Sequence, residues 1–287
     1  MIRLRLPKML LLFALLATAA AAPRPASAAD AFAPPCTLPF EEIKKKHPID
    51  ASCPAEGDTD KEAHMAQNRA KNNFCASGAP ATLTWQNFKA LQKAAEDADI
   101  PFGGSNNLPP DRTKLRGIFA LPSGQKIGEG SVVRYVGFIS NPRYSNTRKR
   151  SDGSAGESVN CNEPGNAPND IHIDLARTDQ DEPACRSITA EISPHFRPPA
   201  WEREHLRLVM DRPVRITGHL FFDASHRPCR NDNDKVSPKR ASIWEVHPVY
   251  AIDVCRSKTT NACPAGNENK WLPLYDWLNV EEQDEEQ

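Results

Sequence analysis

The sequence lacks the short motifs that mark several common catalytic classes. It contains no C-x-x-C pair, which argues against a zinc ribbon or a thioredoxin-type site. It also contains no G-x-S-x-G, the turn that carries a nucleophilic serine in many hydrolases. The cysteines are even in number, so each has a candidate disulfide partner and a free thiolate nucleophile is not expected. Nucleophilic catalysis by serine or cysteine is therefore not predicted.

Excess positive charge and long apolar runs are also missing. The formal net charge is −1, and the first 29 residues hold Lys and Arg but no acid, so the remainder is mildly acidic. This balance argues against a broad basic surface for nucleic acid, although it does not exclude a local one. No segment after residue 29 approaches the roughly eighteen apolar residues of a membrane-spanning helix. Pro is abundant and Gly is modest, which favours a loop-rich fold of short strands over a helical bundle.

The N-terminal stretch is typical of a secretory signal peptide. Arg3, Arg5 and Lys8 precede an apolar run over residues 9–22, and the small residues of 26–29 (ASAA) supply a cleavage site. We therefore expect residues 1–29 to be removed and the protein to be secreted or periplasmic. The alternative is an uncleaved N-terminal anchor.

Export changes the interpretation of the cysteines, because an oxidising compartment permits up to four disulfides. Loop closure favours a bond from Cys36 to Cys53 or Cys75, and a bond between Cys161 and Cys185. The other three would then lie near one another at the C-terminal end. The eight candidates are Cys36, Cys53, Cys75, Cys161, Cys185, Cys229, Cys255 and Cys263.

The spacing of the apolar residues divides the chain into two parts. Residues 30–116 are irregular and then helical, and the clearest helix is 84–98, with an apolar stripe and Thr84 as its cap. Shorter helices or turns are expected at 40–46 and 67–74. This part is predicted to be a small α-rich lobe that contains cysteines. From about residue 117 the period becomes two, and strands are expected at 131–140, 171–175, 187–193, 214–222 and 240–255.

Three strands, a helix through Met210 and two further strands give the element order of the OB-fold, a five-stranded barrel. We therefore predict a mainly β (α+β overall) protein with an OB-like barrel over residues 117–256. A β-sandwich or another small barrel is the alternative. Pro248 removes one hydrogen-bond donor from the last strand, which indicates a bulge or an edge position there. Residues 257–287 form a C-terminal segment that ends in an acidic, disordered tail.

Five segments of the chain resemble a group of uncharacterised exported bacterial proteins. The group shares a D-x-H-I-x-L strand, an A-E-I-x-P-x-x-R turn, a V-R-I-x-G-x-L-x-x-D-x-x-H strand and a W-E-[IV]-H-P-V strand. The matching segments are ESVNC, NDIHIDL, AEISPHFRPPAW, RITGHLFFDASH and WEVHPV, which occur in the same order over the second half of the chain, and KNNFCASG at 71–78 is also similar. The resemblance implies the fold and an exported location, and it implies no catalytic residue.

The polar faces of the strands carry side chains that are suited to a divalent metal. Imidazoles and carboxylates alternate as H-x-D and E-x-H and point away from the barrel interior. A zinc or manganese ion held there could activate water for ester or phosphodiester hydrolysis. The alternative is that these side chains form cross-strand hydrogen bonds and ion pairs. The candidate ligands are His172, Asp174, His219, Asp223, Glu245 and His247, with Glu191, His195 and His226 nearby.

The loop between the first two barrel strands is the other candidate site. OB-folds bind oligonucleotides or oligosaccharides over the second and third strands with flanking loops. This loop contains one aromatic residue and a basic cluster: Arg143, Tyr144, Arg148, Lys149 and Arg150. It could bind single-stranded nucleic acid, or it could be a surface loop with no binding role. Export favours a glycan, an envelope polymer or a protein as the partner. The acidic segment 230–234 lacks the Gly and distal Glu of a calcium loop and is interpreted as a turn.

The sequence therefore predicts an exported, disulfide-stabilised binding module that needs no cofactor and is not assigned as an enzyme. A metal-dependent hydrolase with zinc or manganese is the first alternative. Binding of single-stranded nucleic acid by the barrel face is the second.

Overall fold

A computed structural model describes residues 48–145, 156–179 and 181–285, with side chains placed through residue 279. The α-helices are α1 (Glu62–Lys71), α2 (Trp85–Asp97), α3 (Arg203–Leu208) and α4 (Leu274–Glu285). The strands are β1 (Ala81–Leu83), β2 (Phe119–Ala120), β3 (Lys126–Ile127), β4 (Val132–Tyr144), β5 (Ile171–Ala176), β6 (Ile188–Ile192), β7 (Pro213–Phe222), β8 (Trp244–Cys255) and β9 (Trp271–Pro273). Short 3₁₀ helices lie at Pro48–Ala51, Thr113–Leu115, Ser158–Asn160, Ala184–Arg186, Pro199–Trp201, Thr260–Ala262 and Glu268–Lys270.

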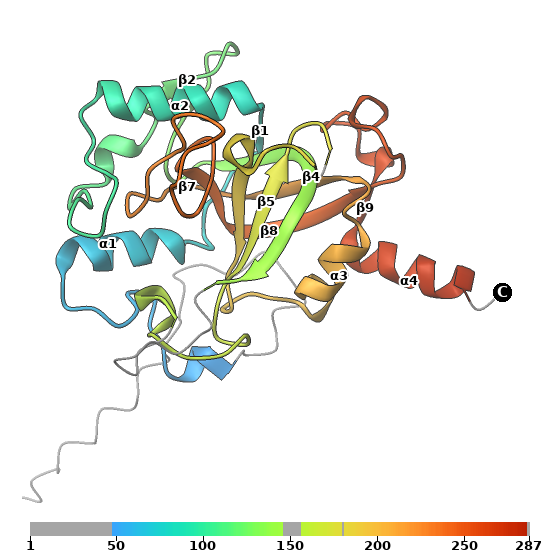
Figure 1. Ribbon diagram of the computed structural model, residues 1–287, viewed down its shortest axis with the longest axis horizontal. Coiled ribbons are helices and arrows are strands. Elements are labelled where there is room, and N and C mark those ends of the chain that lie inside the picture. The colour runs from blue at the N-terminus through green and yellow to red at the C-terminus, as the bar shows by residue number, and fades with distance from the viewer. Residues whose placement is uncertain (1–47, 146–155, 180, 286–287) are drawn as a thin grey trace, which may run out of the picture.

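Five of the strands close into a barrel, as the sequence predicts. The pairing runs β4-β5-β6-β8-β7, and β7 pairs back onto β4 to close the ring. All of these pairs are antiparallel except β6 with β8. The helix α3 lies between the third and fourth barrel strands, which confirms the OB-like order. Helices α1 and α2 lie on one side of the barrel, and α3 and α4 lie on the other (Figure 1).

The strand β4 is long enough to join two halves of the barrel. Its first half pairs with β7 and its second half pairs with β5. Phe138, at the junction, is paired with one residue on each of these strands. A Cβ on Gly137 would lie 2.6 Å from the carbonyl oxygen of Ala176. Glycine is therefore required where β4 passes between its two neighbours.

The expected irregularity at Pro248 is a bulge, and it is not an edge. Gly218 of β7 pairs with Val249, whereas Leu220 pairs with Val246, so the register shifts around the proline. The strand β8 is bordered by β6, β7 and β9.

Helix α2 begins at the cap that the sequence indicates. The side chain of Thr84 accepts a hydrogen bond from the backbone N–H of Asn87, and Asn87 Oδ1 accepts one from the N–H of Thr84. Phe88, Leu91 and Ala95 form its buried stripe, and Phe88 meets Tyr135 of β4 edge to face. One hydrophobic cluster includes these residues and the barrel interior, so α2 and the barrel share a core. The domain limits at residues 116 and 256 stay a prediction.

Three disulfides are defined within the described residues, and they correct the expected pairing. Cys53 bonds Cys161, Cys185 bonds Cys229 and Cys255 bonds Cys263. The predicted bond between Cys161 and Cys185 is therefore wrong, and so is the first of the two alternatives for Cys36, a bond to Cys53. The expected grouping of Cys229 with Cys255 and Cys263 is wrong as well, because Cys229 packs with Cys185 in a separate cluster. Loop closure favours near neighbours in sequence, but the fold brings the 3₁₀ helix after residue 157 beside the start of the described chain. Cys75 is disulfide-bonded as well, and Cys36 lies outside the described residues.

Candidate functional site

A polar cavity of about 610 Å³ lies on the outer side of β4 and β5. We call it the β4–β5 cavity. Three parts of the barrel line it: the end of β4, the outward face of β5 and the loop that joins β7 to β8. Its main lining residues are Arg143, Tyr144, Glu157, His172, Asp174 and His226, together with the segment 236–239.

Arg143 and Tyr144, which the sequence predicts to lie in the loop, belong to β4, because this strand continues to Tyr144 and pairs with β5. Both line the cavity, and both have partners. Arg143 donates to Asp174 Oδ2 at 2.6 Å. The hydroxyl of Tyr144 donates to Glu202 Oε2 at 2.7 Å, and burial together with this hydrogen bond raises the pKa of Tyr144 to about 12. The guanidinium groups of Arg197 and Arg203 lie 5.7 and 5.2 Å from the centre of its ring. The other three candidates, Arg148, Lys149 and Arg150, lie outside the described residues.

Behind the cavity lies a group of buried ionisable side chains on β5, β6 and β8. His172 Nε2 lies 3.0 Å from Glu191 Oε1, and His247 Nδ1 lies 2.9 Å from Glu191 Oε2. The same nitrogen of His247 hydrogen-bonds Glu245 Oε1 at 3.2 Å. Glu191, Glu245 and His247 are at most 1% exposed. The alternation of residues along the strands correctly places these side chains on the outer face of the barrel. They are nevertheless buried on that face and do not contact solvent.

Helix α1 and the loop before β5 cover this group. Lys71 at the end of α1 donates to Glu157 Oε2 at 2.8 Å and lies 3.9 Å from Glu191 Oε2. Asp170, the last residue before β5, is fully buried, and Asn160 Nδ2 donates to its Oδ2 at 3.1 Å. The Cys53–Cys161 bond joins this loop to the chain before α1.

Arg240 connects the group to the β7–β8 loop. It is fully buried, donates to Glu245 Oε2 at 2.7 Å and lies 3.2 Å from Asp223 Oδ2. Asp223 also binds His226 through the same oxygen, at 2.5 Å. We call the whole set the buried ionic cluster; its members are Lys71, Glu157, Asp170, His172, Glu191, Asp223, His226, Arg240, Glu245 and His247.

Burial and charge set the protonation of the cluster. Burial raises the pKa of Asp170 and of Glu245 to about 7. Burial alone would lower the pKa of His247, but Glu191 and Glu245 raise it to about 10. Burial lowers the pKa of His172, although Glu191 and Glu157 act in the opposite direction. Against the cost of burial, His172 and Lys71 hold the pKa of Glu191 well below its usual range.

The predicted metal ligands do not all converge. His219 donates from Nδ1 to the carbonyl oxygen of His247 at 2.8 Å and accepts at Nε2 from the N–H of Gly130 at 2.9 Å, so both ring nitrogens are engaged. Asp174 accepts hydrogen bonds from Arg143 and Asn141 at the cavity wall. His172, Asp223, Glu245 and His247 do belong to the buried ionic cluster.

Within the described residues, one group of three has the spacing of a metal site: Asp170, Glu191 and His247. Each offers one ligand atom, and these atoms lie within 4.8 Å of one another. The sequence pattern places Glu191 on the outer face without including it among the predicted ligands, and it does not indicate Asp170. Asp170 could have been found, because it continues the alternation of His172 and Asp174 by two residues toward the N-terminus.

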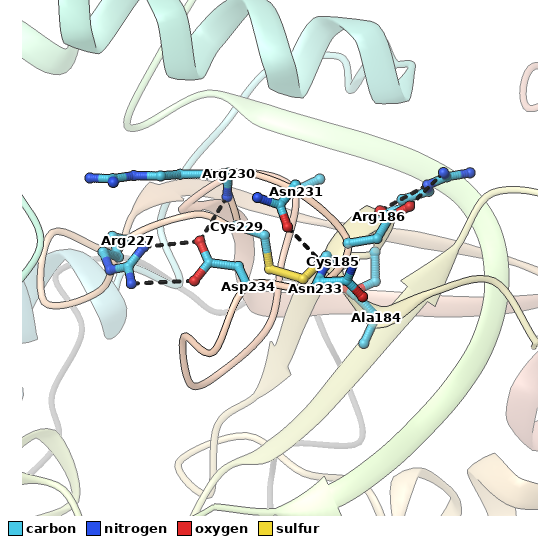
Figure 2. The surroundings of a disulfide bond; sticks show 12 residues. Ala184, Cys185, Arg186, Arg227, Cys229, Arg230, Asn231, Asn233 and Asp234 are labelled. Carbon is cyan, nitrogen blue, oxygen red and sulfur yellow. Dashed lines mark hydrogen bonds and ion pairs between the residues drawn. A yellow bond between two sulfur atoms is a disulfide. The ribbon is translucent and has the colours of Figure 1, made fainter.

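The acidic segment 230–234 is a turn whose side chains bind the protein itself. Asp234 accepts from the guanidinium of Arg227 and from the N–H of Arg230, and Asn231 Oδ1 accepts from the N–H of Asn233 (Figure 2). Asp232 pairs with Arg186 beside the Cys185–Cys229 bond. These contacts explain the turn without a bound ion.

The chain matches no protein-family model, and no curated protein and no solved structure is significantly similar to it. Function must therefore be argued from the site itself. Among the helices of the described residues, none has the length and hydrophobicity needed to cross a bilayer.

Proposed function

We propose that this protein is an exported binding module that holds a polar, largely uncharged ligand such as an oligosaccharide in the β4–β5 cavity. The observation that carries the proposal is the position of the cavity on the barrel. It is bordered by the end of β4 with the adjoining residues of the first loop, by β5, and by the loop between β7 and β8. These are the parts with which OB-folds hold oligonucleotides and oligosaccharides.

The charges of the cavity favour a glycan over nucleic acid. Arg143 is neutralised by Asp174, and Glu157 is neutralised by Lys71. A phosphate backbone requires several unpaired cations, and among the described lysine and arginine side chains that line the cavity only Lys239 lies outside an ion pair. The ring of Tyr144 already lies beside two guanidinium groups, which compete with a stacked base. Carboxylate, amide and imidazole groups suit the hydroxyls of a sugar, because they can accept and donate hydrogen bonds.

The compartment supports the same ligand class. Three disulfides in the described part of the chain indicate an oxidising environment. We propose secretion or a periplasmic location, through the signal peptide expected at residues 1–29, and a cell-envelope glycan as the ligand. The resemblance to exported bacterial proteins supports this proposal and does not name the ligand.

A metal-dependent hydrolase is a second candidate, and the spacing of Asp170, Glu191 and His247 favours it. A hydrolase would need one coordination position of the metal to reach bound substrate. His172 lies at the cavity wall and next to Glu191, so the two sites are neighbours. The catalytic step itself stays a hypothesis.

Binding is tested with the exported protein, its disulfides intact, on an array of bacterial envelope oligosaccharides and on single-stranded DNA oligonucleotides. We expect the protein to bind one class of neutral oligosaccharide. Asn141→Ala and Lys239→Ala remove exposed polar side chains at the cavity. Each is expected to weaken binding by about tenfold, the value of one hydrogen bond of about 1.4 kcal/mol.

The matched control is Lys93→Ala, which removes an exposed lysine on α2 that pairs only locally with Asp97. It should bind like the unchanged protein. Preferential binding of the DNA, or oligosaccharide binding that all three variants weaken equally, would contradict the proposal.

A further inference from the structure

The buried ionic cluster brings five carboxylates together around few permanent cations. These carboxylates are Glu157, Asp170, Glu191, Asp223 and Glu245. The permanent cations are Lys71 and Arg240, and the other basic members are the imidazoles of His172, His226 and His247. Buried carboxylates are rarely left without a cation, because transfer of an unpaired charge from water is costly.

Among the buried polar atoms of the cluster that have no hydrogen-bond partner, one belongs to Asp170 and one to His247. Asn160 binds Oδ2 of Asp170 and leaves the buried Oδ1 unpartnered. Nδ1 of His247 contacts Glu191 Oε2 at 2.9 Å and Glu245 Oε1 at 3.2 Å, and the buried Nε2 has no hydrogen-bond partner. Unpaired polar atoms in a protein interior require an explanation, which an unplaced ion can give.

The contacts around these atoms are those of a prepared metal site. A metal-bound imidazole commonly donates its other N–H to a carboxylate, as the His247–Glu245 contact would allow. Asn160 orients Asp170 in the same manner from the loop side. Two carboxylates and one imidazole suit a divalent first-row ion such as Zn²⁺ or Mn²⁺.

We propose that Asp170, Glu191 and His247 bind one divalent metal ion behind the β4–β5 cavity. The ion adds positive charge among the buried carboxylates and ties β6 and β8 to the loop that carries Asp170. Its binding is independent of the ligand in the cavity, so failure of the glycan proposal leaves it standing. Because the site is buried, the ion is expected to exchange slowly with solvent.

The test is metal content by elemental mass spectrometry on the exported protein after dialysis, followed by chelation and reloading with Zn²⁺, Mn²⁺ or Co²⁺. We expect about one ion per chain and a rise in melting temperature on reloading. Asp170→Asn and His247→Gln should each lower the affinity for the ion by at least about tenfold. The matched control is Glu129→Gln, a buried carboxylate paired with Arg112 outside the cluster, which should retain the ion.

If a variant of a proposed metal ligand does not fold, the proposal is tested on the unchanged protein. X-ray absorption of the loaded protein should show oxygen ligands and one imidazole, and a shell of sulfur or several imidazoles would overturn the proposal. An ion that both ligand variants keep would also overturn it. So would a chain with no bound ion whose melting temperature none of the three metals changes.

Discussion

At the scale of single residues, Arg240 is the cation on which the inner part of the cluster depends. It is fully buried between Glu245 and Asp223. Arg240→Met would leave these carboxylates without their shared partner, and we expect a loss of about 3–5 kcal/mol in the free energy of unfolding. Urea unfolding followed by fluorescence measures this loss.

The control is Arg186→Met, which breaks an ion pair with Asp232 whose side chains are 45% and 42% exposed. Solvent screens such a pair, so its loss should cost less than about 1 kcal/mol. If both variants lost the same free energy of unfolding, burial would not make the ion pairs of Arg240 more important for stability than an exposed pair.

His226 and Asp223 give the protein a defined pH dependence. Burial opposes the charged form of His226, but Asp223 raises its pKa above the usual 6.5. The folded state therefore holds this proton more tightly than the unfolded state. The stabilisation is complete below about pH 6.5 and is lost as pH rises through the raised value. The pKa of Asp223 is well below 3.8, so its own contribution is lost only in acid below that value.

We expect the unchanged protein to lose more stability than His226→Gln between about pH 6 and about pH 9. Denaturant midpoints at the two pH values measure the difference. Identical losses in the two proteins would mean that the pair does not titrate in this range.

Residue types at the site are predictable from sequence, but their burial is not. The alternation around His172 and within the segment of Glu245 and His247 places these side chains on the outer face of the sheet. The cover over that face comes from Lys71 and Asp170, which lie about a hundred residues apart. No local pattern connects them, because their contacts form only when α1 and the loop before β5 pack on the barrel.

At the scale of elements, the bulge between β7 and β8 requires glycine. A Cβ on Gly218 would lie 2.4 Å from the carbonyl oxygen of Pro248 and 2.7 Å from Val246. Gly218→Ala must therefore push the two strands apart, and we expect a loss of about 1–3 kcal/mol in unfolding free energy. Thermal or urea unfolding measures it.

Gly266→Ala is the matched control, because nothing lies within 4 Å of its added Cβ. It should change stability by less than about 0.5 kcal/mol. A Gly218→Ala protein as stable as this control would mean that the bulge accommodates a side chain.

The barrel strands and α2 are predictable because each has a strong local period. Thr84 marks the start of α2, and the five barrel strands contain alternating apolar residues that face one core. The sequence pattern does not predict the strand β1, because three residues are too few to show an alternation and its parallel partner on β4 lies about fifty positions away. The strands β2, β3 and β9 are equally short, and their pairing likewise depends on the packed fold.

At the scale of the whole molecule, the disulfides differ in how much chain they close. Cys53 and Cys161 are 108 residues apart, whereas Cys255 and Cys263 are 8 apart. In the chain-entropy account the longer loop constrains the unfolded state more, by roughly 2 kcal/mol. Paired Cys→Ala replacement at 53 and 161 should therefore destabilise the protein by that much more than replacement at 255 and 263. Equal losses in chemical unfolding would argue against this account.

The central claim is that a polar ligand occupies the β4–β5 cavity, and hydrogen exchange with mass spectrometry tests it most directly. Exchange is measured on the exported protein with and without the neutral oligosaccharide that binds best on the array. The account predicts slower exchange in the ligand-bound protein at residues 141–145, 171–174 and 236–239. Protection confined to another surface, such as the cavity beside α1 that is lined by Ala66, Arg69 and His219, would contradict it.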